Sequence, residues 1–261
     1  LFQSKESSMK LVDLTKPIQY NKNDPWFMKV KIKHKPHGKG KWLIRALGLP
    51  FKLFPTGFGG WADDTIKQMG VHSTTHIDAP WHYGPTCEGK KAKTIDEIPL
   101  EWCYGDGVVI DMSHKPDFEA ISAKEIKDFL SKKKIQLKKG MIVLIRTDRD
   151  RLMGTKDFPD KGTGMSAEAT EWLIDQGIKV MGIDQWGWDL PLKYQIKKSK
   201  ETGNREVFWE GHLVGTRKEY LHIEQLTNLK SLPCSGFKVC VFPLKIVGAS
   251  GAPARVVAMV E

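Results

Sequence analysis

Hydrophobic and polar positions follow a regular order through the middle of the chain. Three apolar runs have the length of buried strands: GVVIDM (107–112), KKGMIVLIRT (138–147) and IKVMGID (178–184). Two amphipathic stretches lie between them with helix start signals: 122–133, where Ser122 and Glu125 have capping-box spacing, and 166–177, with Ser166 as N-cap and Gly177 as the stop. The order β-α-β-α-β predicts an α/β protein whose sheet is at least partly parallel.

The two ends of the chain carry weaker patterns. GFKVCVFPLKI (236–246) predicts another strand, in which Pro243 favours an edge position or a bulge. KVKIKHKPHGKGKW (29–42) alternates like an exposed strand, and LGLPFKLFPTGFGG (47–60) is typical of a loop. The pattern therefore predicts the N-terminal half less firmly than the rest.

Length and composition bound the domain organisation. With 261 residues, 40% of them hydrophobic, the chain can bury a full core as one large domain or two small ones. No linker rich in glycine, serine or proline divides it, so we expect one domain over residues 9–261. The opening LFQS is typical of a protease-cleaved tag, so we expect residues 1–8 to be a tag remnant or a disordered start, with Met9 as the native start.

The net charge of +10 comes mostly from lysine. The lysines are spread over surface-like stretches, and no RNA-binding or helix-turn-helix signature accompanies them, so we expect no nucleic-acid partner. A basic surface instead favours acidic small molecules through electrostatic steering.

Membrane and compartment signals are also informative. No apolar run approaches the roughly 20 residues that span a bilayer, and lysine and glutamate interrupt any signal peptide near the start. The four cysteines are widely spaced without a C-x-x-C pair, which argues against a zinc ribbon or a disulfide scaffold. We therefore expect a cytoplasmic protein with no membrane partner.

The densest group of candidate functional residues is HSTTHIDAPWH (72–82), which holds three of the eight histidines. Imidazole and carboxylate groups together are ligands for zinc, manganese or iron. In a straight strand His72 and His76 would lie roughly 13 Å apart, too far for metal–ligand bonds of about 2 Å. We therefore expect residues 72–76 to curl if both histidines bind one ion.

The exit from this curl is set by Pro80, which favours an extended conformation at Ala79. His76 and Asp78 can then reach one ion from a bent loop, with His82 arriving from just beyond. The alternative is that these are surface histidines, or core histidines with satisfied hydrogen bonds. We favour that alternative for His34, His37 and His114, which lie in lysine-rich or turn-like sequence.

HSTTHIDAPWH resembles the H-x-G-T-H-x-D-x-P-x-H signature of the metal-dependent cyclase-like hydrolases, a family that includes bacterial kynurenine formamidase and isatin hydrolase. The resemblance continues in DLTKPI near the start, in TIDEIPLEWCYGDGVVIDM after the signature and in KVMGIDQWGWD. It implies a swivelling β/β/α fold, a mixed sheet with packed helices. Thr74 stands where the family usually has glycine, a position that would need an unusual backbone angle.

The resemblance also implies a complete ligand set. GHLVGTRKEYLHIEQL supplies a histidine and a glutamate at the family's separation of twelve residues, whereas His222 has the wrong spacing. One ion is then expected on His72, His76 and Asp78, and a second, where two are bound, on Asp78, His212 and Glu224. The alternative for EYLHIEQL is a surface helix whose glutamates face water.

Further roles follow from the same resemblance. It makes His82 the acid/base residue, zinc or manganese the metal, and Trp26 a side chain of the substrate pocket. It implies a homodimer, to which the apolar stretch 42–61 would contribute, unless that stretch covers its own core.

The implied reaction is hydrolysis of a C–N or C–O bond of a small amide, lactam or ester. A divalent ion polarises the carbonyl and makes hydroxide available near neutral pH, and a histidine with an ordinary pKa near 6.5 can relay the proton. Cys87 is better explained as an incidental thiol than as a nucleophile. A non-catalytic protein that binds metal or a small molecule on the same fold remains the alternative.

Overall fold

The computed structural model describes residues 9–261, so the tag remnant or disordered start expected at residues 1–8 lies outside the described part of the chain. Contacts divide the chain into two compact units. The first runs up to Pro17 and resumes over Val71–Glu261, and the second is Ile18–Gly70. One domain over residues 9–261 stays a prediction.

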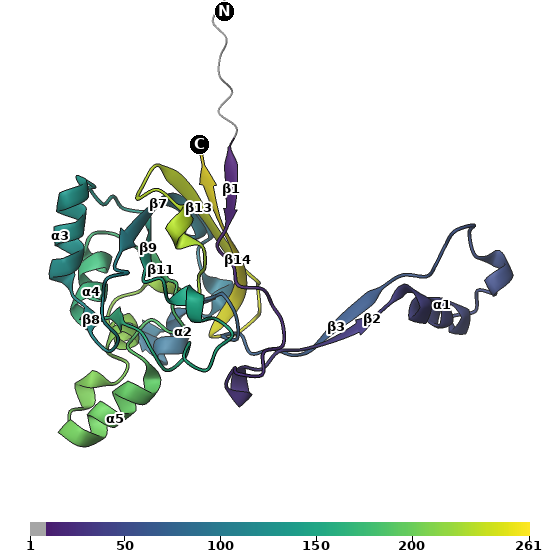
Figure 1. Cartoon of the computed structure of the whole chain (residues 1–261), viewed down its shortest axis with the longest axis horizontal. Coiled ribbons are helices and arrows are strands. Elements are labelled where there is room, and N and C mark those ends of the chain that lie inside the picture. The colour runs from purple at the N-terminus through teal and green to yellow at the C-terminus, as the bar shows by residue number, and fades with distance from the viewer. Residues whose placement is uncertain (1–8) are drawn as a thin grey trace, which may run out of the picture. The chain divides into compact units, whose positions relative to one another are not determined.

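A mixed sheet forms the centre of the first unit (Figure 1). Its eight strands have the order β1-β14-β13-β7-β9-β11-β12-β4, and a further pairing of β14 with β4 closes seven of them into a ring. β7, β9, β11 and β12 are parallel neighbours, and the other pairs are antiparallel. The strands are β1 Lys10–Asp13, β4 His76–Asp78, β7 Tyr104–Asp111, β9 Ile142–Arg146, β11 Val180–Ile183, β12 Leu221–Glu224, β13 Phe237–Pro243 and β14 Gly251–Val260.

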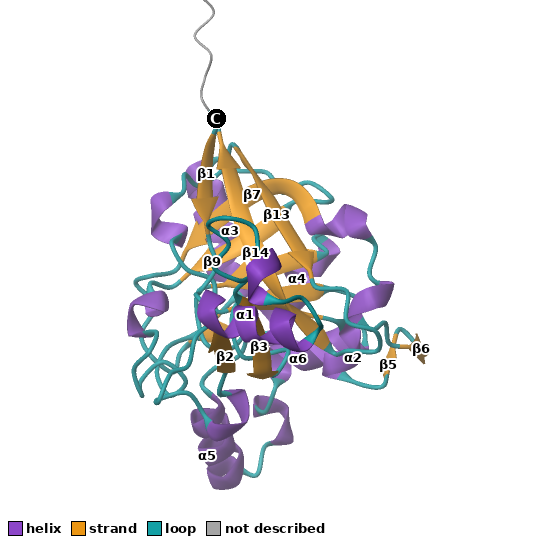
Figure 2. Cartoon of the chain, turned by 90° about the vertical axis from the view of Figure 1, so that its right-hand side faces the viewer, coloured by secondary structure: helices purple, strands orange, loops and turns teal. Residues whose placement is uncertain are grey.

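Helices and short ribbons surround this sheet (Figure 2). The α-helices of the first unit are α2 Pro80–Tyr83, α3 Ala123–Lys133, α4 Ala167–Asp175, α5 Leu192–Thr202 and α6 Glu210–Leu213. Its two-stranded ribbons are β5 Thr86–Cys87 with β6 Lys90–Lys91, and β8 Ala120–Ile121 with β10 Gly164–Met165. Its 3-10 helices are Ile95–Glu97, Leu100–Cys103, Arg149–Leu152, Arg205–Val207, Val214–Thr216 and Leu229–Ser231. No helix within residues 9–261 is long and apolar enough to cross a membrane.

The predicted β-α-β-α-β order is confirmed as β7, α3, β9, α4 and β11. The side chains of Ser122 and Glu125 form the predicted capping box at the start of α3. The Ser166 hydroxyl accepts a hydrogen bond from the Ala169 amide at the start of α4, and Gly177 ends that segment with φ of 85°. The predicted α/β class with a mixed sheet and packed helices is therefore confirmed.

Pro243 lies in a part of β13 that has only one partner strand. This suits proline, which has no backbone N–H to donate to a second strand. β13 pairs with β14 along its whole length, but its pairing with β7 ends at Cys240. The expectation of an edge position for Pro243 is confirmed.

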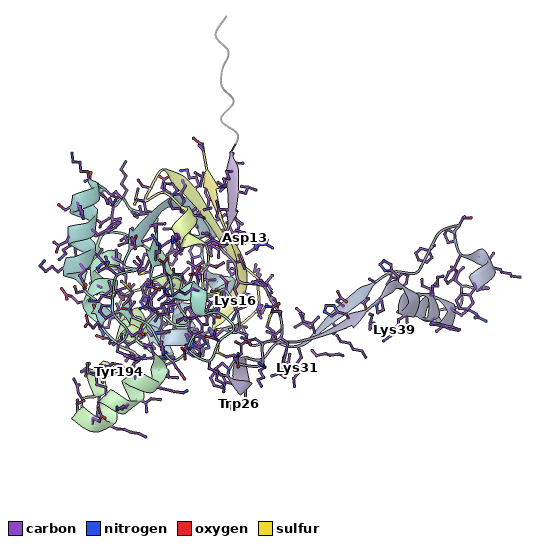
Figure 3. All side chains as sticks on the ribbon, in the orientation of Figure 1. Asp13, Lys16, Trp26, Lys31, Lys39 and Tyr194 are labelled. Atoms are coloured by element: carbon purple, nitrogen blue, oxygen red, sulfur yellow. The ribbon has the colours of Figure 1, made fainter. Side chains whose placement is uncertain are left out.

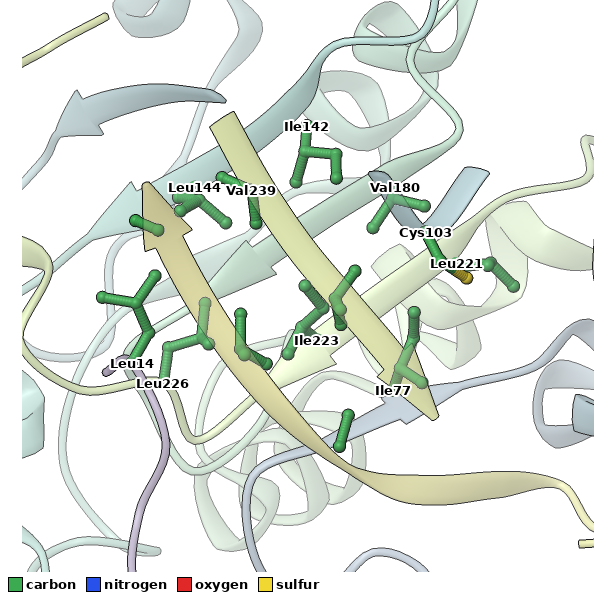
Figure 4. Packing of buried hydrophobic residues seen from close by; sticks show 14 of the residues in the cluster. Leu14, Ile77, Cys103, Ile142, Leu144, Val180, Leu221, Ile223, Leu226 and Val239 are labelled. Atoms are coloured by element: carbon green, nitrogen blue, oxygen red, sulfur yellow. The ribbon is translucent and has the colours of Figure 1, made fainter. Parts of the chain in front are cut away.

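Both faces of the parallel strands are buried. Side chains from all seven strands of the ring fill its interior, among them Ile77, Leu144, Val180, Ile223 and Val239 (Figure 4). The alternate residues of β7, β9 and β11 pack against α3 and α4 in a second cluster. Continuous apolar runs predicted these strands correctly because neither face meets water.

The second unit consists of an antiparallel ribbon of β2 Lys31–Lys35 and β3 Asp63–Gln68 with helix α1 His37–Ala46 and the 3-10 helices Trp26–Met28 and Phe51–Leu53. The exposed strand expected over 29–42 was therefore only partly right. Pro36 precedes α1 and ends the strand, since proline lacks a ladder donor. Gly40 permits the helix to lie against the backbone of Trp61, because a Cβ there would be 2.1 Å from the Trp61 carbonyl oxygen.

Candidate metal centre

Two neighbouring strands place four polar side chains on one face of the sheet. In the antiparallel register of β4 and β12, His222 lies opposite Asp78, and Glu224 lies opposite His76. The residues between them, Ile77 and Ile223, point into the interior of the ring, so alternation directs their neighbours to the opposite face. EYLHIEQL thus contains a buried strand, and the surface helix considered for it is not formed.

The segments that flank β4 add two more histidines. The chain turns over residues 71–75, which brings the His72 and His76 rings to 4.9 Å between centroids, as the expected curl requires. Ala79 is extended, with φ −93° and ψ 159°, as expected before a proline. His82 follows on α2, and its ring centroid lies 4.1 Å from that of His72.

The fully buried Asp78 carboxylate is the common partner of these histidines. The nearest nitrogen–oxygen distances to it are 2.7 Å for His72, 3.0 Å for His222, 3.2 Å for His76, 3.7 Å for His82 and 3.8 Å for His212. Burial raises the pKa of Asp78, but the attraction of His82, His72 and His76 is stronger in sum and holds that pKa well below its usual value. The carboxylate is therefore ionised in the interior.

The second segment reaches the same place through α6 and β12. His212 Nε2 lies 3.5 Å from Glu224 Oε1, and Glu224 Oε2 lies 3.6 Å from His76 Nε2. The Trp188 amide donates a 2.8 Å hydrogen bond to Glu224 Oε1, which fixes the carboxylate. The structure thus brings His72, His76, Asp78, His82, His212 and Glu224 together.

Buried atoms in this cluster fit a divalent cation. In residues 9–261, the buried side-chain atoms without a hydrogen-bond partner include His72 Nδ1, His76 Nε2, His222 Nε2 and both carboxylate oxygens of Asp78. Buried polar atoms are normally paired, because leaving one unpaired costs about 1–3 kcal/mol. Two groups have ligand atoms within 4.8 Å of one another: Asp78, His212, His222 and Glu224, and His72, Asp78 and His82. Histidine nitrogen and carboxylate oxygen donors together are ligands that divalent transition metals take in proteins.

Outer hydrogen bonds orient the candidate ligands. His76 Nδ1 donates to the Thr74 carbonyl at 2.6 Å, which leaves Nε2 with a lone pair. Asp189 hydrogen-bonds to Nδ1 of His212, and therefore Nε2 is directed to the cluster. On the other side, Gly251 leaves room, because a Cβ there would be 2.9 Å from the His72 ring.

Thr74 does not have the unusual backbone angle considered for it. Thr74 is not one of the residues within 9–261 that have a positive φ. Its hydroxyl donates to the Lys16 carbonyl at 3.3 Å, while its own carbonyl orients His76. A side chain at this position is therefore accommodated without strain.

Among the histidines of this site, His72 and His82 are the most exposed, with 25% and 23% of their side chains accessible to solvent. Burial lowers the pKa of His82 to about 4, although the Asp78 carboxylate opposes this. The imidazole is therefore neutral at neutral pH and can accept a proton.

Three of the site's residues were missed or dismissed at the sequence level. His222 was set aside for its spacing, yet its Nε2 lies 3.3 Å from Glu224 Oε1. Asp189 lies within KVMGIDQWGWD, so its segment was noticed but its role was not. Trp209 stacks on His212 with centroids 4.5 Å apart, and the sequence contained no signal for that contact.

Trp26, expected in the substrate pocket, belongs to the second unit and is 81% exposed (Figure 3). Its place in a pocket stays a prediction.

Fold and site together define a mixed α/β protein with a closed sheet and a buried His/Asp/Glu cluster that could hold metal. The model of the family described as "Putative cyclase" matches residues 12–190. The chain therefore belongs to the cyclase family, as the resemblance in its sequence implied.

Individual relatives agree with this assignment. The chain is 26% identical over 198 residues to cyclase-like protein 3 of Arabidopsis thaliana, covering 76% of this chain and 65% of that protein. It is 25% identical over 189 residues to a kynurenine formamidase of Bacillus mycoides (strain KBAB4), covering 72% of this chain and 76% of that one. The chain thus spans just under two thirds of the Arabidopsis protein.

Solved structures share the fold. Isatin hydrolase A from Labrenzia aggregata, solved bound to benzyl benzoate, has a TM-score of 0.71 at 25% identity, covering 97% of this chain and 94% of that one. A structure described as a potential metal-dependent hydrolase with cyclase activity has a TM-score of 0.63 at 24% identity, covering 97% and 99%.

Proposed function

We propose that this chain is a metal-dependent hydrolase that cleaves a C–N or C–O bond next to the carbonyl of a small amide, lactam or ester. The observation that carries this proposal is the convergence of unpartnered buried nitrogen and oxygen atoms on the outer face of β4 and β12. The likeness to a kynurenine formamidase and to isatin hydrolase A supports the reaction class.

In this proposal His72, His76 and Asp78 bind one zinc or manganese ion, and Asp78, His212 and Glu224 bind a second where two are present. The Asp78 carboxylate has one oxygen near His72 and His76 and the other near His212, so it can serve both positions. A divalent ion supplies Lewis acidity and makes hydroxide available at neutral pH.

His82 is the proposed acid/base residue. Its Nε2 lies 3.7 Å from Asp78 Oδ2, and its partly exposed ring is open to solvent as the buried His76 is not. The ring can take a proton from water and return it to the leaving amine or alcohol. His72 and His82 are near neighbours, with ring centroids 4.1 Å apart, so bound metal and turnover are to be measured together in a His82 variant.

The substrate is a small molecule that could stack on aromatic side chains. Trp209 lies beside His82 at 5.2 Å between ring centroids, at the partly exposed side of the cluster. A flat amide, lactam or ester would gain contact area against such a ring. We keep Trp26 as a proposed side chain of the substrate pocket on the family resemblance alone.

We further infer a cytoplasmic homodimer without nucleic-acid or membrane partners. All four cysteines are free thiols, which suits a reducing compartment. The stretch 42–61 exposes large apolar side chains, including Trp42 at 68%, Leu53 at 60% and Trp61 at 43%, which a second copy could cover.

A substrate panel tests the function against the non-catalytic alternative. Purified protein is loaded with Zn²⁺ or Mn²⁺ and incubated with aryl formamides, lactams and small esters, and product release is compared with that of chelator-treated protein. We expect metal-dependent turnover of at least one class. Metal binding with sustained inactivity across the panel would favour a binding protein on the same fold.

A further inference from the structure

His222 is fixed on the face that carries the candidate ligands. It lies directly opposite Asp78 in the β12–β4 register and is fully buried. Its ring stacks against Trp188, with centroids 5.0 Å apart and planes at 8°, and against Tyr83, at 5.2 Å and 28°. Aromatic contacts of this kind leave the imidazole little freedom to turn away from Asp78.

The Nδ1 side of this ring faces two tyrosine hydroxyls. Tyr83 Oη lies 3.2 Å from Nδ1, and Tyr220 Oη lies 3.1 Å from it. The Tyr220 hydroxyl donates to the Gly211 carbonyl at 2.9 Å, and the Tyr83 hydroxyl donates to the Asp78 carbonyl at 3.4 Å. Because each hydroxyl has one proton, these two donations leave both oxygens with lone pairs towards His222, an arrangement that favours the tautomer with the proton on Nδ1.

The Nε2 side faces two carboxylates. Nε2 lies 3.0 Å from Asp78 Oδ2 and 3.3 Å from Glu224 Oε1. With Nδ1 protonated, a neutral imidazole would turn its Nε2 lone pair towards these negative oxygens, which is unfavourable in a buried site. A positive charge between them removes this conflict, and either a proton on Nε2 or a metal ion supplies it.

The spacing of the donor atoms is that of a small coordination sphere. Four ligands at about 2.1 Å in tetrahedral arrangement have donor atoms about 3.4 Å apart. The measured distances are 3.0 and 3.3 Å from His222 and 3.8 and 3.5 Å from His212, to Asp78 and Glu224 respectively. All four donor atoms lie within 4.8 Å of one another.

We propose that His222 is a nitrogen ligand of the ion held by Asp78, His212 and Glu224, with Tyr83 and Tyr220 fixing its tautomer. This inference rests on the proposed function and adds a ligand to it. Four protein ligands close a metal site, whereas catalytic sites keep a position open. The ion at His222 therefore organises the cluster, and the substrate is taken at His72, His76 and Asp78.

Metal binding tests this assignment without an activity assay. Metal-free protein is titrated with Zn²⁺ alone and Mn²⁺ alone by calorimetry, and bound metal is counted by mass spectrometry. We expect two ions per wild-type chain, and H222Q should weaken one of them by more than about 100-fold. Tyr220→Phe removes only an outer partner and should weaken the same ion by about 10–100-fold. The exposed His114→Gln is the matched control and should change neither ion.

A wild-type crystal soaked in Zn²⁺ gives an independent answer that does not depend on the folding of H222Q. Anomalous density about 2.1 Å from His222 Nε2 supports the assignment. Density bonded to Asp78 and Glu224 but not to His222 overturns it, as does a wild type that binds one ion with the same affinity as H222Q. In that last case metal-dependent hydrolysis would still stand, whereas a wild type that binds no metal would refute the proposed function itself.

Discussion

At the scale of residues, the site depends on which nitrogen of each histidine is left free. His76 donates through Nδ1 to a backbone carbonyl, whereas His212 uses a carboxylate and His222 uses tyrosine hydroxyls. Each of these outer partners leaves Nε2 directed at Asp78. His82 differs, since no such partner is seen for its ring among the described hydrogen bonds, and it keeps some exposure. This difference is the physical basis for giving it another role.

We predict that His82→Ala keeps the bound metal while kcat falls by about 10²–10⁴-fold, because a positioned acid/base contributes about that much. Bound metal and turnover are measured on the same preparation, with the exposed His114→Ala as control. Near-normal turnover would remove His82 from the mechanism. Loss of metal together with activity would make it a ligand, as its place within 4.8 Å of His72 and Asp78 allows.

At the scale of elements, the sequence predicted those features that are determined by residues close together in the chain. The capping box of α3, the N-cap of α4, the buried strands and the candidate ligands in residues 72–82 depend on residues close together in the sequence. His222 could not be recognised in this way, because its role follows from the pairing of β12 with β4, strands that lie far apart in the chain. Helix α1 was missed for a related reason, since Gly40 within it is explained by a contact with Trp61 that the sequence does not show.

The end of β11 provides a pH-dependent test of the sheet. Burial raises the pKa of Asp184 to about 7 from 3.8, although hydrogen bonds from Thr147 and Asp148 oppose this. The folded state then holds a proton that the unfolded state releases between about pH 4 and 7, so this group's contribution to stability falls as pH rises through that range. The stabilising contribution of Asp184 is fully present below about pH 4.

We therefore predict that the free energy of unfolding of the wild type, relative to Asp184→Asn, decreases as pH rises from about 4 to 7. Urea unfolding in the presence of a chelator measures this difference without a contribution from metal. A difference that is constant, or that grows with pH, would show that Asp184 is ionised throughout.

At the scale of the whole molecule, one centre connects segments from distant parts of the first unit. The turn before β4, helix α2, helix α6 and strand β12 all contribute to it. The sequence indicated one cluster at residues 72–82 and, through family resemblance, the second segment. It did not indicate that residues 18–70 would form a unit of their own, because no linker composition marks its ends. The homodimer stays a prediction.

The most direct test of the metal centre is calorimetric titration of metal-free wild type and His76→Ala with Zn²⁺ or Mn²⁺ alone. His34, exposed and paired with Asp64, gives the control His34→Ala. We predict tight binding by wild type and control, and a loss of affinity of more than about 100-fold in His76→Ala, since removal of a ligand should exceed the 10–100-fold effect of an outer partner. A folded His76→Ala that retains full metal content at full affinity would contradict it.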